Sequence, residues 1–166
     1  MQIEVVRTAK YYKAYKKNTP LVLATIQKAL PYLKQEFPLV DFDKVKVVIR
    51  PIKGRNTTGS HRQIFGRQEI EIDCRQADPK RILDTIAHEI THAEQCQTKR
   101  LQMDQVVVES PGNFRFCHIW TEGGETKEFA KNAGSTYKAY RALPWEIEAF
   151  ARGEAFAKKY LERIVG

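Results

Sequence analysis

The chain has 166 residues, of which 42% are hydrophobic and 29% are charged. This length and composition favour one globular domain spanning residues 1–166 and argue against a disordered chain. No apolar run approaches the roughly 20 residues that cross a bilayer. The opening "MQIEVVRTAKYYKAYKK" lacks the apolar region of a signal peptide, so we expect a cytoplasmic protein without a membrane partner.

The net charge is +8. Such a balance attracts polyanions, so non-specific nucleic-acid contact is one interpretation, and a basic protein without that role is the other. The segment "YYKAYKK" could stack on bases and hold phosphates. We favour an amphipathic segment whose tyrosines pack while its lysines face water. Cys74, Cys96 and Cys117 form no CxxC pair, which suits a reducing cytosol.

The first predicted helix is "NTPLVLATIQKALPYLKQEF", with Asn18 or Thr19 as its cap and Pro20 at its first position. Pro31 is expected to kink or break this helix. The alternation and β-branched residues of "KVKVVIR" predict a strand. The following "PIKGRNTTGSHRQ" has the composition of a polar loop.

The next segment, "QIFGRQEIEID", predicts a hairpin that turns near Gly66 and continues into the strand "EIEID". Asp78 and Pro79 are an N-cap and a first-turn proline, and they open a helix that runs to about Thr98.

The segments "FRFCHIW" and "ETKEFA" flank "TEGG", which predicts a second hairpin. Gly134 and Ser135 mark a loop. Pro144 opens a last helix that runs to about Ile164. Strands gathered between helices indicate an α+β fold with one small, mainly antiparallel sheet.

The sequence "IAHEITH" (residues 86–92) contains two histidines four residues apart. This spacing places His88 and His92 on one face of a helix, where both imidazoles can reach one Zn²⁺ ion. Glu89 lies at the edge of that face and could accept a proton without binding the metal. This is the HExxH pattern of zinc hydrolases.

A helical wheel shows where these histidines point. The apolar residues of the helix fall together on one stripe: Ile82, Ile86, Ile90 and Ala93. His88 and His92 fall on nearly the opposite side. They therefore face either open water or a cleft that other parts of the chain close.

A third ligand would decide between these alternatives, and five residues are candidates: His61, Cys96, His118, Glu146 and Glu148. Cys96 lies about 12 Å along the axis from His88, too far to share one ion on a straight helix. We interpret Cys96 as a packed, inert thiol. His61, in the glycine-containing loop, has nothing in its favour. For His118 the roles of ligand, substrate contact and ordinary strand residue all stay open.

The last helix, "LPWEIEAFARGEAFAKKYLERIVG", favours Glu146. Glu146 lies on its apolar, inward stripe, whereas Glu148 falls with the charged residues of the solvated face. An inward carboxylate is costly unless it is paired or bound to a metal. The alternative is a first-turn glutamate that favours the helix N-terminus. We expect Glu146 to be the third ligand.

The segments "ILDTIAHEITHAEQ" and "YRALPWEIEAFARGEAFA" together resemble zincin-type metallopeptidases with a downstream glutamate ligand. The nearest likenesses are small phage or bacterial ImmA/IrrE-type and SprT-like metallopeptidases. The resemblance implies a minimal zincin-like domain in which His88, His92 and Glu146 bind Zn²⁺ and Glu89 is the base. The interval of 146 − 92 = 54 residues and Phe150, where the ImmA/IrrE pattern has asparagine, depart from that subgroup.

The leading hypothesis is therefore a zinc-dependent peptidase acting on a peptide or protein substrate, with Glu89 as general base. Tyr137, Tyr140 or His118 could donate to the oxyanion. Zincins bind substrate on an edge strand before the motif helix, a role that "EIEID" would fill here. One rival is a zinc-containing regulatory or nucleic-acid-associated protein without proteolysis. Another is an α+β binding domain in which HExxH is accidental.

Overall fold

The computed structural model describes residues 1–6, 17–53 and 57–166, and the greater part of the "YYKAYKK" segment lies outside these ranges. Its elements are β1 (Gln2–Val5), α2 (Thr19–Glu36), a 3-10 turn (Phe42–Lys44), β2 (Val45–Arg50), β3 (Gly59–Ile64), β4 (Arg67–Asp73), α3 (Pro79–Gln97), β5 (Leu101–Ser110), β6 (Asn113–Glu122), β7 (Glu125–Ala130), α4 (Tyr137–Arg141) and α5 (Pro144–Val165). The predicted α+β class is confirmed.

The described strands form two sheets, so the prediction of one small, mainly antiparallel sheet was wrong. The first sheet has the order β1-β2-β4-β3, and its β1–β2 and β2–β4 pairs are parallel. Parallel strands need a crossover, which α2 supplies between β1 and β2. No strand was predicted before α2, so this crossover was not predicted either. The strand "EIEID" belongs to the internal β4, so the edge-strand role expected for it was wrong. The edge strand next to β4 is β3, which begins inside the predicted loop at Gly59.

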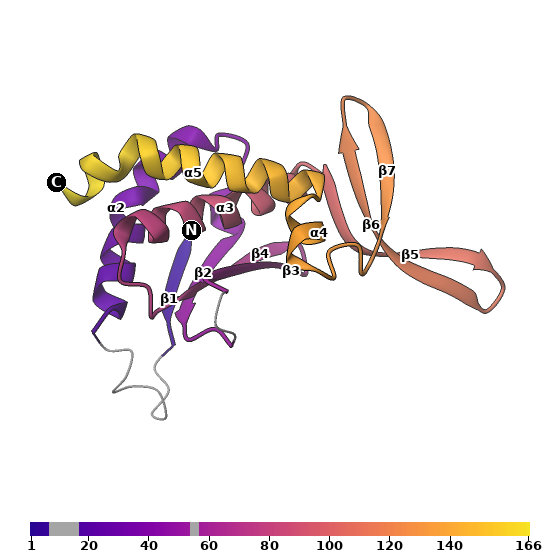
Figure 1. The fold of residues 1–166 in the computed structure, drawn as a ribbon, viewed down its shortest axis with the longest axis horizontal. Coiled ribbons are helices and arrows are strands. Elements are labelled where there is room, and N and C mark those ends of the chain that lie inside the picture. The colour runs from indigo at the N-terminus through magenta and orange to yellow at the C-terminus, as the bar shows by residue number, and fades with distance from the viewer. Residues whose placement is uncertain (7–16, 54–56) are drawn as a thin grey trace.

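The helices lie in layers on one face of this sheet (Figure 1). Helix α3 packs against β3 and β4 on one side and against α5 on the other. The main core joins the sheet to α2, α3 and α5, and its fully buried members include Ile26, Val47, Ile72, Ile86 and Ala157. Because α3 lies between two layers, both its apolar stripe and its histidine face are covered.

The helix starts follow the local sequence signals. The Asp78 side chain accepts a hydrogen bond from the Lys80 backbone N–H, and Pro79 occupies the first turn of α3. Helix α2 continues through Pro31 to Glu36, so the proline does not break it. None of the helices in the described part of the chain combines the length and apolarity needed to cross a membrane.

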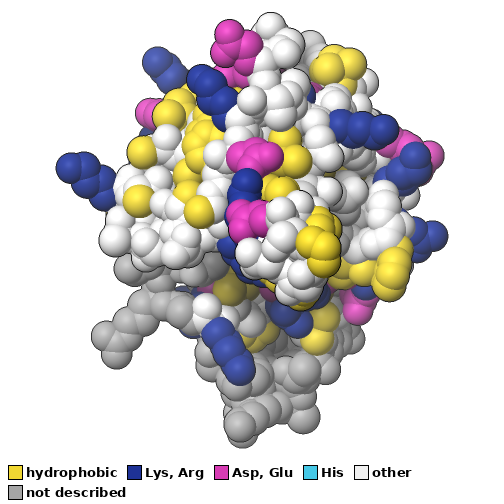
Figure 2. Space-filling view, turned by 90° about the vertical axis from the view of Figure 1, so that its right-hand side faces the viewer, with side chains coloured by type: hydrophobic (Ala, Val, Ile, Leu, Met, Phe, Trp, Pro, Cys, Tyr) yellow, Lys and Arg dark blue, Asp and Glu magenta, His cyan; other side chains and the backbone are white. Residues whose placement is uncertain are grey.

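Strands β5, β6 and β7 form the second sheet, an arm that projects from one end of the molecule (Figure 1). The β6–β7 hairpin was predicted, but β5 and α4 were not. Side chains at the base of the arm pack on Trp145. Farther out, hydrophobic side chains on paired positions of β5 and β6 are exposed: Val106, Val108, Phe114 and Phe116. Seen from this end, hydrophobic side chains reach the surface among charges of both signs (Figure 2).

Candidate metal centre

Helix α3 places His88 and His92 one turn apart on the side that faces α5. His88 is 8% exposed, His92 is 4% exposed and Glu89 is 6% exposed, so none of the three is an ordinary surface residue. The open-water interpretation of the histidines is therefore excluded. Helix α5 covers their face. It comes so close at Gly153 that a Cβ added there would lie 3.3 Å from His88 Cβ.

Glu146 comes from the first turn of α5 and points at both histidines. The Nε2 atoms of His88 and His92 are 3.1 Å apart. Each Nε2 lies 3.4 Å from a different Glu146 carboxylate oxygen. Ligand atoms bound tetrahedrally to zinc at about 2.0–2.2 Å are separated by roughly 3.3–3.6 Å. The three side chains are thus spaced as ligands of one small ion, and this group could hold a metal.

The hydrogen-bonding of Glu146 also fits a cation. Its Oε2 is buried and has no hydrogen-bond partner in the described structure. Burial would raise the pKa of this carboxyl, but the nearby imidazoles of His88 and His92 outweigh burial and lower the pKa to about 2. Burial likewise opposes charge on His92, yet Glu146 raises the pKa of His92 to about 9. An anionic carboxylate beside two imidazoles suits a divalent metal such as zinc.

Glu89 lies beside this group without joining it. Its pKa is raised because burial disfavours the carboxylate, and the nearby Glu146 charge adds to that effect. The carboxyl group lies under the start of β3, where a Cβ on Gly59 would come within 2.7 Å of Glu89 Oε1. Only a glycine leaves this space, so the edge strand can approach the HExxH helix closely at this point.

A cleft of about 380 Å³ opens onto these residues, and its walls include Gly59, His88, Glu89, Tyr140 and Phe150. Burial together with the nearby Glu146 charge raises the pKa of Tyr140. Of the three residues considered for the oxyanion, Tyr140 and Tyr137 line the cleft.

The other ligand candidates have different surroundings. His118 lies on β6, where its ring packs against Trp145 and its Nδ1 accepts a hydrogen bond from the Asp104 N–H. The Glu148 carboxylate receives hydrogen bonds from the Arg100 guanidinium, at 3.1 and 2.5 Å, so the prediction of a solvated face for it was wrong. Burial raises the pKa of the Cys96 thiol to about 12, as expected for an inert thiol.

His61 comes closer to the centre than the sequence suggested. It lies on β3, with its ring centroid 6.0 Å from that of His92. Its Nε2 is 2.7 Å from Gln68 Oε1, and its buried Nδ1 has no partner in the described structure. Burial and the His92 charge lower the pKa of His61 to about 4. His61 therefore lies near His92 but is not a member of the ligand group.

Gln95 was not among the predicted site residues. Gln95 is fully buried, and its Oε1 is 2.9 Å from His92 Nδ1. The spacing held a signal, because Gln95 lies three residues after His92 and so on the same face of α3.

Comparison with known proteins gave no match to a protein-family model, to a curated protein or to a solved structure.

Proposed function

We propose that this protein is a zinc-dependent peptidase in which His88, His92 and Glu146 hold the metal. The observation that carries the proposal is the convergence of these three side chains from α3 and α5, with the HExxH glutamate beside them. A structural zinc site normally has four protein ligands, whereas three ligands leave a position for water or substrate.

A Zn²⁺ ion held by this group would lower the pKa of a bound water to about 7 and polarise the scissile carbonyl. Glu89 would take the proton from the attacking water and return it to the leaving amine. Its burial and raised pKa suit this role, because a base that carries a proton between two steps works best with a pKa near the operating pH. Tyr140, on the cleft wall, is the candidate donor to the oxyanion.

The edge strand β3 supports a peptide as the substrate. Among the strands that the structure describes, β3 pairs only with β4, and its other edge is left free for an added strand. Gly59 brings this strand against Glu89. An extended peptide that added to this edge would therefore pass beside the catalytic base, which is the geometry of β-augmentation.

Metal content and activity measured together test the proposal. Wild type should hold one zinc per chain by elemental mass spectrometry and should cleave a dye-labelled unfolded protein such as casein. Glu89→Gln should keep the zinc and lose at least about 100-fold in cleavage rate. Glu146→Ala should lose most of the zinc.

A wild-type protein that holds no zinc, even after reconstitution, would overturn the peptidase proposal. Undiminished cleavage by Glu89→Gln would remove Glu89 as the base. The net charge of +8 keeps one alternative, a zinc-containing nucleic-acid-associated protein. Salt-dependent DNA binding by zinc-loaded Glu89→Gln, with no cleavage by wild type, would favour that alternative.

A further inference from the structure

A buried amide joins the two helices that carry the metal-binding side chains. Gln95 Oε1 is 2.9 Å from His92 Nδ1. Gln95 Nε2 donates to the Trp145 carbonyl oxygen at 3.1 Å and to Glu148 Oε2 at 3.2 Å. Trp145 directly precedes Glu146, so a single side chain contacts one ligand and the backbone next to another.

The surroundings of Gln95 fix which way its amide points. The Trp145 carbonyl and the Glu148 carboxylate can only accept hydrogen bonds, so the amide NH₂ must face them. The amide oxygen must then face His92, which requires a proton on His92 Nδ1. In the neutral imidazole that binds a metal, the lone pair of His92 is therefore on Nε2, the atom that lies 3.4 Å from Glu146 Oε1.

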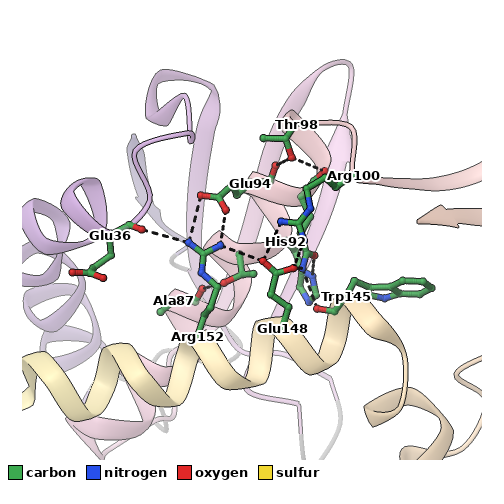
Figure 3. A network of polar contacts seen from close by, with 11 residues as sticks. Glu36, Ala87, His92, Glu94, Thr98, Arg100, Trp145, Glu148 and Arg152 are labelled. Atoms are coloured by element: carbon green, nitrogen blue, oxygen red, sulfur yellow. Dashed lines mark hydrogen bonds and ion pairs between the residues drawn. The ribbon is translucent and has the colours of Figure 1, made fainter. Parts of the chain in front are cut away.

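Glu148 is itself held in place (Figure 3). Arg100 donates to both Glu148 oxygens, and its guanidinium lies over the Trp120 ring at 4.8 Å. Arg152 is within 3.5 Å of Glu148 Oε1 and binds Glu94. The acceptor that orients Gln95 is therefore anchored by two cations.

We propose that Gln95 is a positioning residue of the metal centre, which holds His92 in the tautomer and orientation that present Nε2 to the metal. This inference rests on the proposed function only in requiring that His88, His92 and Glu146 bind a metal; it does not require proteolysis. Partners of this kind on ligating histidines typically change metal affinity by about 10- to 100-fold when they are removed.

Two substitutions separate positioning from a purely structural link between the helices. Gln95→Leu removes both functions of the amide. Gln95→Glu keeps an oxygen that accepts from His92 Nδ1 but loses the NH₂ that binds the Trp145 carbonyl. Both substitutions are made in a Glu148→Gln background, so that the new carboxylate does not face the Glu148 carboxylate. Positioning of His92 therefore predicts rescue by Gln95→Glu, and a structural link does not.

The readouts are Zn²⁺ affinity by chelator competition and the visible absorption spectrum of the Co²⁺-substituted protein. Gln95→Leu should bind zinc about 10- to 100-fold more weakly than the Glu148→Gln parent, with an altered cobalt spectrum. Gln95→Glu should stay within a few-fold of this parent and keep its spectrum. Gln97→Leu is the matched control, because Gln97 is hydrogen-bonded to Asp41 away from the site, and it should leave both readouts unchanged.

Equal weakening by Gln95→Leu and Gln95→Glu would overturn the positioning role and leave only a link between helices. If Gln95→Leu kept the zinc affinity and cobalt spectrum of the Glu148→Gln parent, the positioning role would also be overturned, and the proposed peptidase function would be unaffected. Failure of the wild-type protein to bind either ion would overturn this inference and the proposed function together.

Discussion

Gly153 on α5 lies so close to Asp84 on α3 that an added Cβ would stand 2.5 Å from Asp84 Oδ1 and 2.7 Å from the Asp84 backbone oxygen. Rotation of the Asp84 side chain could relieve only the first of these contacts. The distance between the two helices, and with it the distance from Glu146 to His88, therefore depends on a residue without a side chain.

We expect Gly153→Ala to lower the free energy of unfolding by about 1–3 kcal/mol, because the added methyl group pushes α5 away from α3. Helix propensity alone would raise the free energy of unfolding by about 1 kcal/mol, so the direction of the change distinguishes the two effects. Urea unfolding measures the change. Ala151→Gly, on the exposed side of the same helix, is the control and should cost about 1 kcal/mol. A stabilised Gly153→Ala variant would show that the two helices can separate without penalty.

Glu148→Gln should keep a full zinc stoichiometry at saturating metal, in contrast to Glu146→Ala. It should also lower the free energy of unfolding by about 1–2 kcal/mol, because Arg100 loses a charged partner in a partly buried setting. Elemental analysis measures the zinc stoichiometry, and urea unfolding measures the free energy of unfolding. His118→Ala serves as a second comparison and should also retain zinc. Loss of zinc stoichiometry from either variant would contradict the assignment of Glu146 as third ligand.

The metal-free protein should lose stability as the pH rises above 6.5. Glu146 raises the pKa of His92 from 6.5 to about 9, against the effect of burial, so folding favours the protonated form. The resulting stabilisation is complete below pH 6.5 and is lost as the pH rises through 9. The lowered pKa of Glu146 belongs to the same ion pair, and its contribution is lost as the pH falls from 4.5 toward 2.

Urea unfolding of chelator-treated protein at pH 5.5 and pH 8.5 tests this, and we expect a loss of roughly 1–3 kcal/mol at the higher pH. Glu146→Gln is the control, since a neutral amide removes most of the cause. An unchanged wild-type stability across this range would show that no proton is held between His92 and Glu146. A zinc ion bound here would replace that proton, so zinc affinity should increase with pH.

The β3–β4 turn offers a stabilising substitution. Phe65 has a φ of +46° and is followed by Gly66 at +77°, and the Phe65 side chain is fully exposed. Asn-Gly is the preferred pair in such turns because asparagine tolerates the left-handed region. Phe65→Asn should raise the free energy of unfolding by about 0.5–1 kcal/mol, whereas Phe65→Val should lower it. The urea midpoints of the two variants should therefore move in opposite directions, and a shift in the same direction would contradict the argument.

The parts of the fold that the sequence predicted well depend on local signals. Three such signals each specify a helix boundary or face within a few residues: the Asp78 cap, the apolar stripe of α3 and the proline at the start of α5. The inward direction of Glu146 also followed from one helical wheel. These features gave the three metal-site candidates before any tertiary structure was known.

The parts that were missed depend on contacts between distant segments. The parallel β1–β2 pair joins residues more than forty positions apart, and no local pattern predicts such pairing. β5 carries a bulge between Gln102 and Gln105, which interrupts the alternation of a regular strand. Arg100, the bidentate partner of Glu148, comes from the segment between α3 and β5, so a wheel for α5 alone could not show this contact.

In the sequence, the strands of the arm lie between α3 and α5, the two helices that carry the candidate metal ligands. His92 and Glu146 are 146 − 92 = 54 residues apart, and β5, β6 and β7 all lie between them. A metal ion bound to both residues is thus a cross-link that closes this segment into a loop. Because these ligands come together only in the folded chain, the free energy of binding such an ion would add to the stability of the fold. The arm could then differ in length or sequence at little cost to folding, because the bound ion keeps its two ends together.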